Sequence, residues 1–331
     1  MKPSANHISP FRPLPFLGNP HVQTIVGSYF RGPIPPLPVR LSTVRLTDGD
    51  QLVLYDSKPP GWCPGGVMAL LVHGLGGSHR STYEQRLAAL LLPHGIRVVR
   101  MDMRGAARGL PLARGTYNGG CSEDIRAVVA ELRCWDPAAR VVLVGFSLGG
   151  NIVLKLAGEA AARPVPGLEA VAALNPPIDL EACSRLIGLP ENRIYDRHFA
   201  QLLVQQVHRQ RRFFPDLPPI HLPPEPTLWE FDDLFTAPRG GFRNALDYYR
   251  RCSSAPLVPA IQVPALLMTA RDDPFVAAEP FERLPSRPNI AVRIEAHGGH
   301  LGYVGRDGRG RYRWAEPRLA EWIVETMMKD E

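Results

Sequence analysis

The sequence predicts an α/β fold: a mostly parallel, doubly wound sheet with an inserted helical cap. Two observations lead to this prediction. Short apolar runs, typical of buried parallel strands, alternate along the 331 residues with amphipathic helical patterns. The alternation is interrupted only between residues 178 and 262, and a stretch of this length without a buried strand is too long for a loop.

The expected elements follow in chain order. Residues 39–57 read as two strands joined at Asp48-Gly49, a dipeptide typical of hairpin turns. Buried strands are predicted at 67–74, 96–102, 140–146, 168–175, 263–270 and 289–296. Helices are predicted at 83–92, 121–135, 151–162 and 314–328. With right-handed crossovers, these helices cover both faces of the sheet. Residues 1–177 and 263–331 are therefore expected to form the core, and residues 178–262, which lack a buried strand, are expected to form the cap.

Composition excludes several classes of protein. Apolar residues make up 45% of the chain, enough for a large core, but no run approaches the roughly 18 apolar residues of a membrane span. The N-terminus "MKPSANHISPFRPLPFLGNP" has no apolar signal region, so a signal peptide is not expected. The five cysteines are scattered singly, which argues for a reducing cytoplasm and against both a disulfide framework and a zinc site. No metal is therefore predicted.

The formal charge of +6 does not indicate a nucleic-acid partner. The 34 arginines and 4 lysines are spread along the chain, whereas nucleic-acid binding requires clustering. The nearest approach to a cluster is "RQRRFF" at 209–214, which we interpret as a solvated patch on the cap.

A serine stands at a strand-to-helix corner in "VVLVGFSLGGN". Ser147 has glycine two residues before it and two after it, and Gly150 extends the patch of small residues. This G-x-S-x-G pattern is typical of a nucleophile elbow, in which a strained turn raises the serine hydroxyl above the sheet. A dinucleotide-binding turn would need glycine in place of Ser147, and a Walker loop needs G-K-[ST], which is absent. Ser147 is therefore predicted to be a nucleophile.

A serine hydroxyl needs a base, and on such a sheet the acid and then the histidine follow at the ends of later strands. Asp272 and Asp273 follow the strand at 263–270, and His297 and His300 follow the strand at 289–296. His300 lies in a glycine-flanked loop that suits a base reaching back to the serine. Asp273 is preferred as the acid, because a residue before proline favours an extended backbone that directs its side chain across the strand ends.

Two backbone amides are needed to hold the oxyanion of an acyl-transfer intermediate. One is predicted to be that of Leu148, directly after the serine. The other is predicted to be that of Leu75, because "LLVHGLGGSHRS" (70–81) ends a strand and opens a flexible loop. His73 and His79 precede the serine, against the expected order of residues, and we interpret His73 as structural.

Segments spread over nearly the whole chain resemble the α/β-hydrolase superfamily. They are "NPHVQTI" (19–25), "LVHGLGGS" (71–78), "DMRG" (102–105), "GFSLGGN" (145–151), "FDDLFTAPRGGF" (231–242), "DYYRRCSS" (247–254), "ARDDPF" (270–275) and "GGHLGY" (298–303). Within it, the chain is similar to a bacterial branch related to mammalian α/β-hydrolase-domain lipases and yeast medium-chain ethyl esterases. Carried over position by position, the resemblance implies a triad of Ser147, Asp273 and His300.

The resemblance also implies a substrate class: short- to medium-chain acyl esters or acylglycerols, hydrolysed without a cofactor. Relatives often have Tyr-His where this chain has Tyr117-Asn118, so no role is assigned to that loop. Mammalian relatives begin with a membrane anchor that this chain lacks, which implies a soluble form and leaves transient contact with a lipid surface open. Thioester cleavage, transfer to an alcohol and an inactive binding module remain alternatives, and the oligomeric state is left open.

The cap is expected to roof the site, since it is inserted where the strands end. Its apolar side chains are predicted to line an acyl pocket, with a small core of the cap's own as the alternative. They are Phe199, Leu202, Leu203, Phe213, Phe214, Trp229, Phe231 and Phe235. Arg209, Arg211 and Arg212 are expected to stay in solvent.

Overall fold

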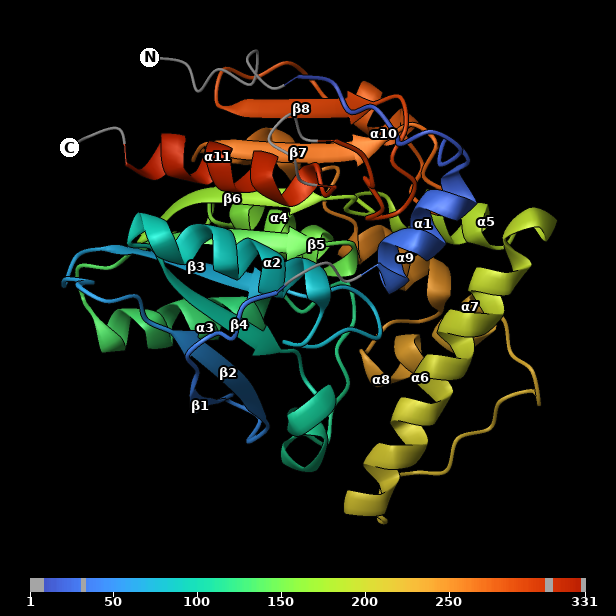
Figure 1. Cartoon of the computed structure of the whole chain (residues 1–331). Coiled ribbons are helices and arrows are strands. Elements are labelled where there is room, and N and C mark those ends of the chain that lie inside the picture. Colours follow the sequence, from blue (N-terminus) through green and yellow to red (C-terminus); the bar gives the residue numbers. More distant parts are fainter. Residues whose placement is uncertain (1–8, 31–33, 307–311, 329–331) are drawn as a thin grey trace.

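An eight-stranded sheet runs through the computed structural model, which describes residues 9–30, 34–306 and 312–328 (Figure 1). Its strands are β1 (Arg40–Arg45), β2 (Gln51–Ser57), β3 (Val67–Val72), β4 (Arg97–Asp102), β5 (Arg140–Phe146), β6 (Leu168–Leu174), β7 (Ala265–Ala270) and β8 (Ile290–Glu295), in the spatial order β1-β2-β4-β3-β5-β6-β7-β8. Strand β2 pairs antiparallel with β1 and β4, and all other pairs are parallel. The predicted mostly parallel sheet is confirmed.

Alternate residues of each central strand point to opposite faces, and both faces are covered. In β3, Met68, Leu70 and Val72 enter one core, whereas Val67, Ala69 and Leu71 enter the other. Helices α3 (Ser122–Trp135) and α4 (Leu148–Glu159) pack on the first face. Helices α2 (Thr82–Leu91) and α11 (Ala315–Met327) pack side by side on the second face (Figure 1).

Two helices differ from the sequence prediction by more than one residue at their start. Helix α4 begins at Leu148 rather than at residue 151, because the serine corner itself is the N-cap. Helix α1 (Pro20–Tyr29) was not predicted at all. Its start is nevertheless encoded locally: the side chain of Asn19 accepts hydrogen bonds from the amides of His21 and Val22, and a proline occupies the first helical position.

Residues 178–262 contain helices and no strand. The helices are α5 (Leu180–Ile187), α6 (Arg193–Phe213), α7 (Leu228–Phe231), α8 (Ala237–Arg239) and α9 (Ala245–Cys252), with a π-helical turn at Asp232–Thr236. The long α6 runs along the outer side of the molecule (Figure 1). The remaining helical pieces are α10 (Glu279–Glu282) and short 3-10 turns at Leu92–His94, Ala107–Leu112, Pro190–Asn192 and Val258–Ala260.

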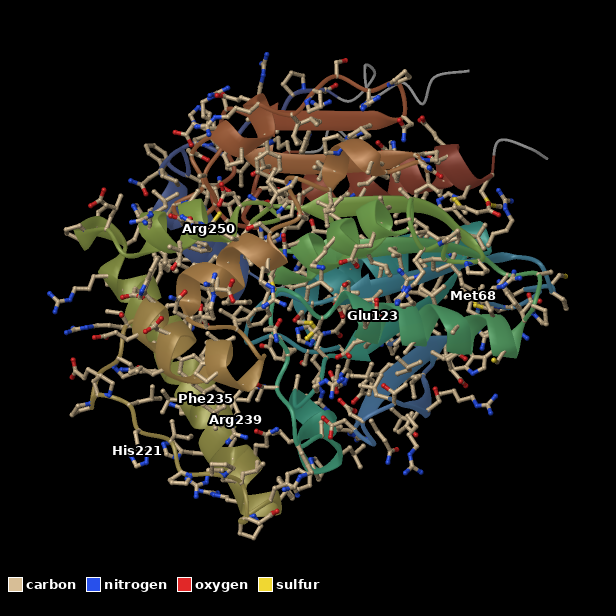
Figure 2. The ribbon with its side chains drawn as sticks, turned by 180° about the vertical axis from the view of Figure 1, so that it is seen from behind. Met68, Glu123, His221, Phe235, Arg239 and Arg250 are labelled. Atoms are coloured by element: carbon tan, nitrogen blue, oxygen red, sulfur yellow. The ribbon has the colours of Figure 1, made fainter. Side chains whose placement is uncertain are left out.

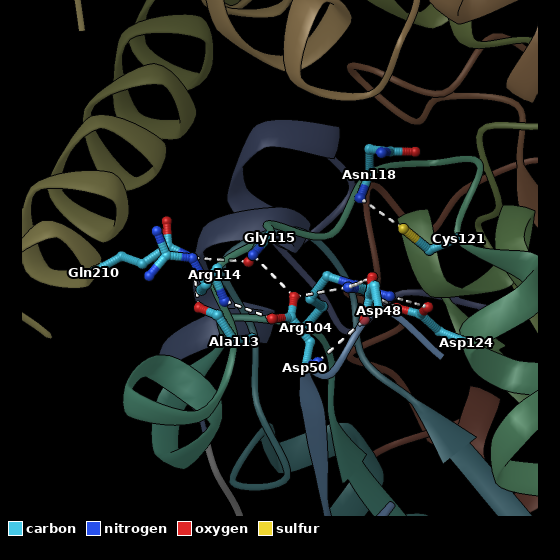
Figure 3. A network of polar contacts seen from close by, with 10 residues as sticks. All are labelled: Asp48, Asp50, Arg104, Ala113, Arg114, Gly115, Asn118, Cys121, Asp124 and Gln210. Carbon is cyan, nitrogen blue, oxygen red and sulfur yellow. Dashed lines mark hydrogen bonds and ion pairs between the residues drawn. The ribbon is translucent and has the colours of Figure 1, made fainter. Parts of the chain in front are cut away.

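Helix α6 is tied to the core through a loop after β4 (Figure 3). The side chain of Gln210 donates hydrogen bonds to the carbonyls of Ala113 and Gly115, at 2.9 and 2.7 Å. Arg104, in the same loop, bonds Asp50 at 2.7 Å and also reaches the carboxylates of Asp48 and Asp124. A loop held in this way gives the cap a firm attachment beside the strand ends.

Candidate active site

The serine corner is as tight as its small residues predict. Ser147 has φ 50° and ψ −125°, a strained conformation for any residue other than glycine. A Cβ at Gly145 would lie 2.4 Å from the carbonyl oxygen of Gly149, and a Cβ at Gly149 would lie 2.3 Å from that of Val72. Only glycine allows helix α4 to pack so closely on strands β3 and β5, and this packing holds the serine at the carboxyl edge of the sheet.

The structure brings Ser147 and His300 together. The Ser147 hydroxyl lies 2.9 Å from Nε2 of His300, and Nδ1 of the same ring lies 2.8 Å from a carboxylate oxygen of Asp273. Because a carboxylate only accepts, the ring donates from Nδ1 and presents its Nε2 lone pair to the hydroxyl. This tautomer is the one that can remove a proton from the serine.

Asp273 is oriented by three donors besides the histidine. Its Oδ1 accepts from the amides of Phe275 and Val276, both at 3.0 Å, and its Oδ2 accepts from the side-chain nitrogen of Asn175 at 2.7 Å. Asn175 stands directly after β6 with a φ of 46° and was not singled out from the sequence. The sequence does contain a signal for Asn175, because it is a polar residue at the carboxyl end of β6, the strand next to the one that carries the serine.

Asp272 points elsewhere. It accepts from the amide of Gly299 at 2.9 Å and lies 3.2 Å from Nδ1 of His297, whose side chain is half exposed. The two neighbouring carboxylates therefore pair with two different histidines. Of the two pairs, only Asp273 and His300 reach the serine.

Helix α1 supports the loop that carries His300. Gln23 donates to the carbonyl of Val304 at 3.1 Å and accepts from the Val304 amide at 2.8 Å. A Cβ at Gly299 would lie 2.4 Å from the carbonyl oxygen of Pro20, and one at Gly302 would lie 2.6 Å from that of Gln23. The sequence singled out "NPHVQTI" without assigning it a role; in the structure, this segment packs against the histidine loop.

The loop after β3 leaves one amide free beside the serine. The amide of Gly74 donates to the hydroxyl of Tyr83 at 3.0 Å, and the amide of Gly76 donates to the hydroxyl of Tyr117 at 2.7 Å. The amide of Leu75, between them, has no partner among the described residues. Tyr117 comes from the loop to which the sequence assigned no role, and here it orients the backbone next to Leu75.

The second predicted donor is the amide of Leu148. It opens helix α4, where no carbonyl of a preceding turn is available, and the positive end of the helix dipole lies at this point. A Cβ at Gly74 would lie 2.9 Å from Cβ of Ser147, so the Leu75 loop passes very close to the serine. Two amides flanking a serine in this way can bind a developing oxyanion.

The two earlier histidines are engaged in other contacts. His73 is fully buried; its Nδ1 donates to the Gly74 carbonyl at 2.7 Å, and its Nε2 accepts from the Met103 amide at 3.1 Å. Burial lowers the pKa of His73 and keeps it neutral. His79 lies 2.9 Å from a carboxylate oxygen of Asp102. Neither ring reaches Ser147 in the described structure.

A pocket of about 900 Å³, including its open mouth, begins at Ser147 and is lined by both core and cap. Its apolar lining includes Leu148, Leu180, Ile187, Leu203, Val207, Phe231, Phe235 and Phe275. The core supplies the floor with the serine, and helices α5 and α6 and the segment from α7 through the π-helical turn supply much of the wall.

The predicted apolar lining is partly wrong. Of the eight cap residues expected, Phe199, Leu203, Phe231 and Phe235 line the pocket. Phe213 is 54% exposed, Phe214 packs on the Arg114 guanidinium and Trp229 packs on Tyr249. Leu202 also misses the pocket and lies against Gly76, where an added Cβ would be 3.0 Å from its Cδ1. Phe213 misses the pocket because α6 is amphipathic and presents only one face to the core. Leu203, Phe231 and Phe235 also pack together, so the pocket wall is at the same time the cap's own small core.

The cap arginines lie at the surface. Arg209 and Arg212 are exposed and Arg211 is half-buried. Arg239 covers the ring of Phe235 with its guanidinium at 5.5 Å, and Figure 2 shows both residues on the cap. These positions fit the interpretation of "RQRRFF" as a solvated patch.

Fold and geometry together define the class of this protein: an α/β sheet whose serine corner carries a hydrogen-bonded Ser-His-Asp set. The model of the alpha/beta hydrolase family matches residues 69–309, and the chain belongs to this family.

Known proteins similar to the chain agree with the resemblance seen in its sequence. YheT of Escherichia coli (strain K12) is 32% identical over 95% of this chain and 93% of that protein. Phospholipase ABHD3 of Mus musculus is 28% identical over 82% of this chain and 67% of that protein. Medium-chain fatty acid ethyl ester synthase/esterase 2 of Saccharomyces cerevisiae (strain ATCC 204508 / S288c) is 28% identical over 78% of this chain and 62% of that protein.

A solved structure supports the fold independently. The Pyrococcus furiosus esterase Pf2001 matches with a TM-score of 0.56 and 16% identity, covering 96% of this chain and all of that one. Within the described residues, no helix is both long enough and apolar enough to cross a membrane.

Proposed function

We propose that this protein hydrolyses short- to medium-chain carboxylic esters, acylglycerols included, with Ser147 as nucleophile, His300 as base and Asp273 as orienting acid. Family membership and the names of its relatives place the chain among the carboxylic ester hydrolases. The observation that carries the proposal is the hydrogen-bonded relay from Ser147 through His300 to Asp273 at the mouth of an apolar pocket.

The first half-reaction forms an acyl-enzyme. His300 takes the proton of Ser147 as its oxygen attacks the ester carbonyl, and the buried carboxylate of Asp273 stabilises the imidazolium. The amides of Leu75 and Leu148 hold the oxyanion, and the loss of one such donor typically costs about 10²–10³ in rate. The tetrahedral intermediate then collapses, and the leaving alcohol takes the proton from His300.

The second half-reaction repeats these steps with water. His300 removes a proton from water, the hydroxide attacks the acyl-enzyme, and the carboxylic acid leaves as Ser147 regains its proton. An alcohol in place of water would yield a new ester. The name of the yeast relative, a synthase and esterase, makes such transfer the second candidate activity.

Labelling with a fluorophosphonate probe tests the proposal, because only an activated serine reacts with it. We expect the wild-type protein to be labelled and to hydrolyse p-nitrophenyl butyrate. Ser147→Ala should fold normally, escape labelling and keep less than about a tenth of the wild-type kcat. Ser42→Ala, on strand β1 away from the site, serves as the control and should behave as wild type.

Absence of labelling in the wild-type protein would instead support a binding module of the same fold. Labelling without ester cleavage would support thioester hydrolysis instead. Ethanol added to the assay distinguishes hydrolysis from transfer, because only transfer yields an ethyl ester.

A further inference from the structure

A chain of polar groups crosses the cap side of the pocket, away from the catalytic relay. The Ser184 hydroxyl on α5 lies 3.0 Å from the hydroxyl of Tyr249 on α9, which lies 2.8 Å from Oδ2 of Asp232 in the π-helical turn. All three residues line the pocket that contains Ser147. Each is less than a tenth exposed, at 8%, 2% and 8% respectively, so bulk water does not satisfy them freely.

The direction of these hydrogen bonds follows from the carboxylate at their end. An ionised Asp232 only accepts, so the Tyr249 hydroxyl donates to it, and the Ser184 hydroxyl must in turn donate to Tyr249. Thr236 also donates to Asp232. Ser184 is therefore left with unused lone pairs on Oγ, and no described residue donates to that oxygen.

The cap maintains this arrangement at a cost. Burial raises the pKa of Asp232 to about 6, against hydrogen bonds from Thr236 and Tyr249 that act in the opposite direction. Neutral side chains could join the turn to α9 without burying a charge. A carboxylate at this place instead sets the direction of every hydrogen bond from Ser184 to Asp232 and leaves the Ser184 oxygen as an acceptor at the pocket wall.

We propose that Oγ of Ser184 accepts a hydrogen bond from a free hydroxyl group of the substrate. Preferred esters would then carry a hydroxyl, either on the acyl chain or on the alcohol part, as in a monoacylglycerol. Leu180, Ile187 and Phe231 line the same pocket, so a substrate lacking the hydroxyl leaves the acceptor unpaired in a largely apolar wall. This inference rests on the proposed ester hydrolysis.

Two substrate pairs test it and separate the two sources of the hydroxyl. The first pair is p-nitrophenyl octanoate and a derivative hydroxylated on the acyl chain, at carbon 3, 6 or 8 in turn. The second pair is monooctanoylglycerol and propyl octanoate. The wild-type enzyme should prefer the hydroxylated member of at least one pair in kcat/KM. Ser184→Ala should reduce that preference about five- to tenfold, the usual effect of one hydrogen bond. Ser184→Thr, which retains the hydroxyl, should restore it.

A second variant tests the direction of the chain. Tyr249→Phe removes the acceptor of the Ser184 proton, so Ser184 can then donate into the pocket. In this variant, kcat/KM for the 6-oxo derivative of p-nitrophenyl octanoate should therefore rise relative to kcat/KM for the 6-hydroxy derivative. If the enzyme cleaves plain esters and neither variant changes its preference for hydroxylated esters, the inference is overturned and the proposed function stays intact. Failure to cleave any ester would overturn the proposed function itself.

Discussion

The amide of His300 donates a hydrogen bond of 2.9 Å to the hydroxyl of Thr24, 276 residues earlier in the chain. The Thr24 hydroxyl donates a hydrogen bond to the carbonyl of Pro20 at 2.8 Å, so a lone pair of its oxygen faces the His300 amide. Both Thr24 and His300 are buried. The N-terminal helix therefore fixes the backbone from which the imidazole reaches Ser147.

Replacement of Thr24 should reveal this support. Thr24→Val keeps the shape but leaves the buried His300 amide unpaired, so kcat/KM on p-nitrophenyl butyrate should fall about tenfold. Thr24→Ser retains the hydroxyl and should stay within about twofold of wild type. Wild-type kinetics in the valine variant would show that the loop holds its shape without helix α1.

The two adjacent carboxylates should differ sharply. Asp273→Asn disturbs the tautomer and charge balance of His300, and kcat should fall by roughly 10⁴, as in other hydrolases with this relay. Asp272→Asn weakens the contact with the half-exposed His297 and keeps an oxygen that can accept from the Gly299 amide, so kcat should change little. Steady-state kinetics of both variants decide the matter, and the reverse ranking would remove Asp273 from the relay.

Gly149→Val should damage folding as well as chemistry. Its side chain would begin 2.3 Å from the backbone oxygen of Val72 and 2.4 Å from that of His73, and backbone in a buried strand cannot move aside cheaply. We expect a large fall in the thermal midpoint or loss of soluble protein. Gly18→Val, where nothing lies within 4 Å of the new Cβ, is the matched control. Equal melting of the two variants would contradict the close packing of α4 on β3.

The apolar pocket should select for acyl length. From acetyl to about hexanoyl or octanoyl p-nitrophenyl esters, kcat/KM should rise by close to fourfold per carbon, since a buried methylene contributes about 0.8 kcal/mol. Phe199→Ala should flatten this rise, because Phe199 lines the pocket. Phe213→Ala, on the same helix but 54% exposed, should not. A series that is flat or falls beyond acetyl would show that the cap excludes acyl chains.

Asp232 should make stability depend on pH. Its folded pKa of about 6 lies above the ordinary 3.8, because burial disfavours the charged form. The folded state then holds a proton that the unfolded state has released, so the free energy of unfolding falls as pH rises from about 4 to 6. The full difference is on the order of 3 kcal/mol. Burial also raises the pKa values of Glu84 and Asp124, so Asp232→Asn should make this decline shallower rather than abolish it. Urea unfolding curves taken between pH 4.5 and 7.5 measure the change, and parallel pH profiles for the two proteins would refute the assignment.

Several features were readable from the sequence because their causes are local. The apolar runs predicted the strands β3 to β8, since a buried parallel strand needs no partner in sequence to be recognised. The serine corner was recognisable because glycine is the only residue that permits the strand–helix contact at Gly145 and Gly149. Helix α1 escaped prediction because its Asn-Pro start is followed by only a weak apolar pattern.

By itself, the sequence determined the strands, the four helices that cover the sheet and the residue types that follow each strand, because hydrophobic period and turn chemistry act over a few neighbouring residues. Only the tertiary structure decided which carboxylate pairs with which histidine, since Asp272 and Asp273 differ by one position and their partners lie 25 and 27 residues away. It also decided that Thr24 supports His300, that Tyr117 orients the loop of Leu75 and that Phe213 misses the pocket. These outcomes depend on contacts across the fold, and a side chain's direction in such contacts is set by the packing of whole elements rather than by its neighbours in the chain.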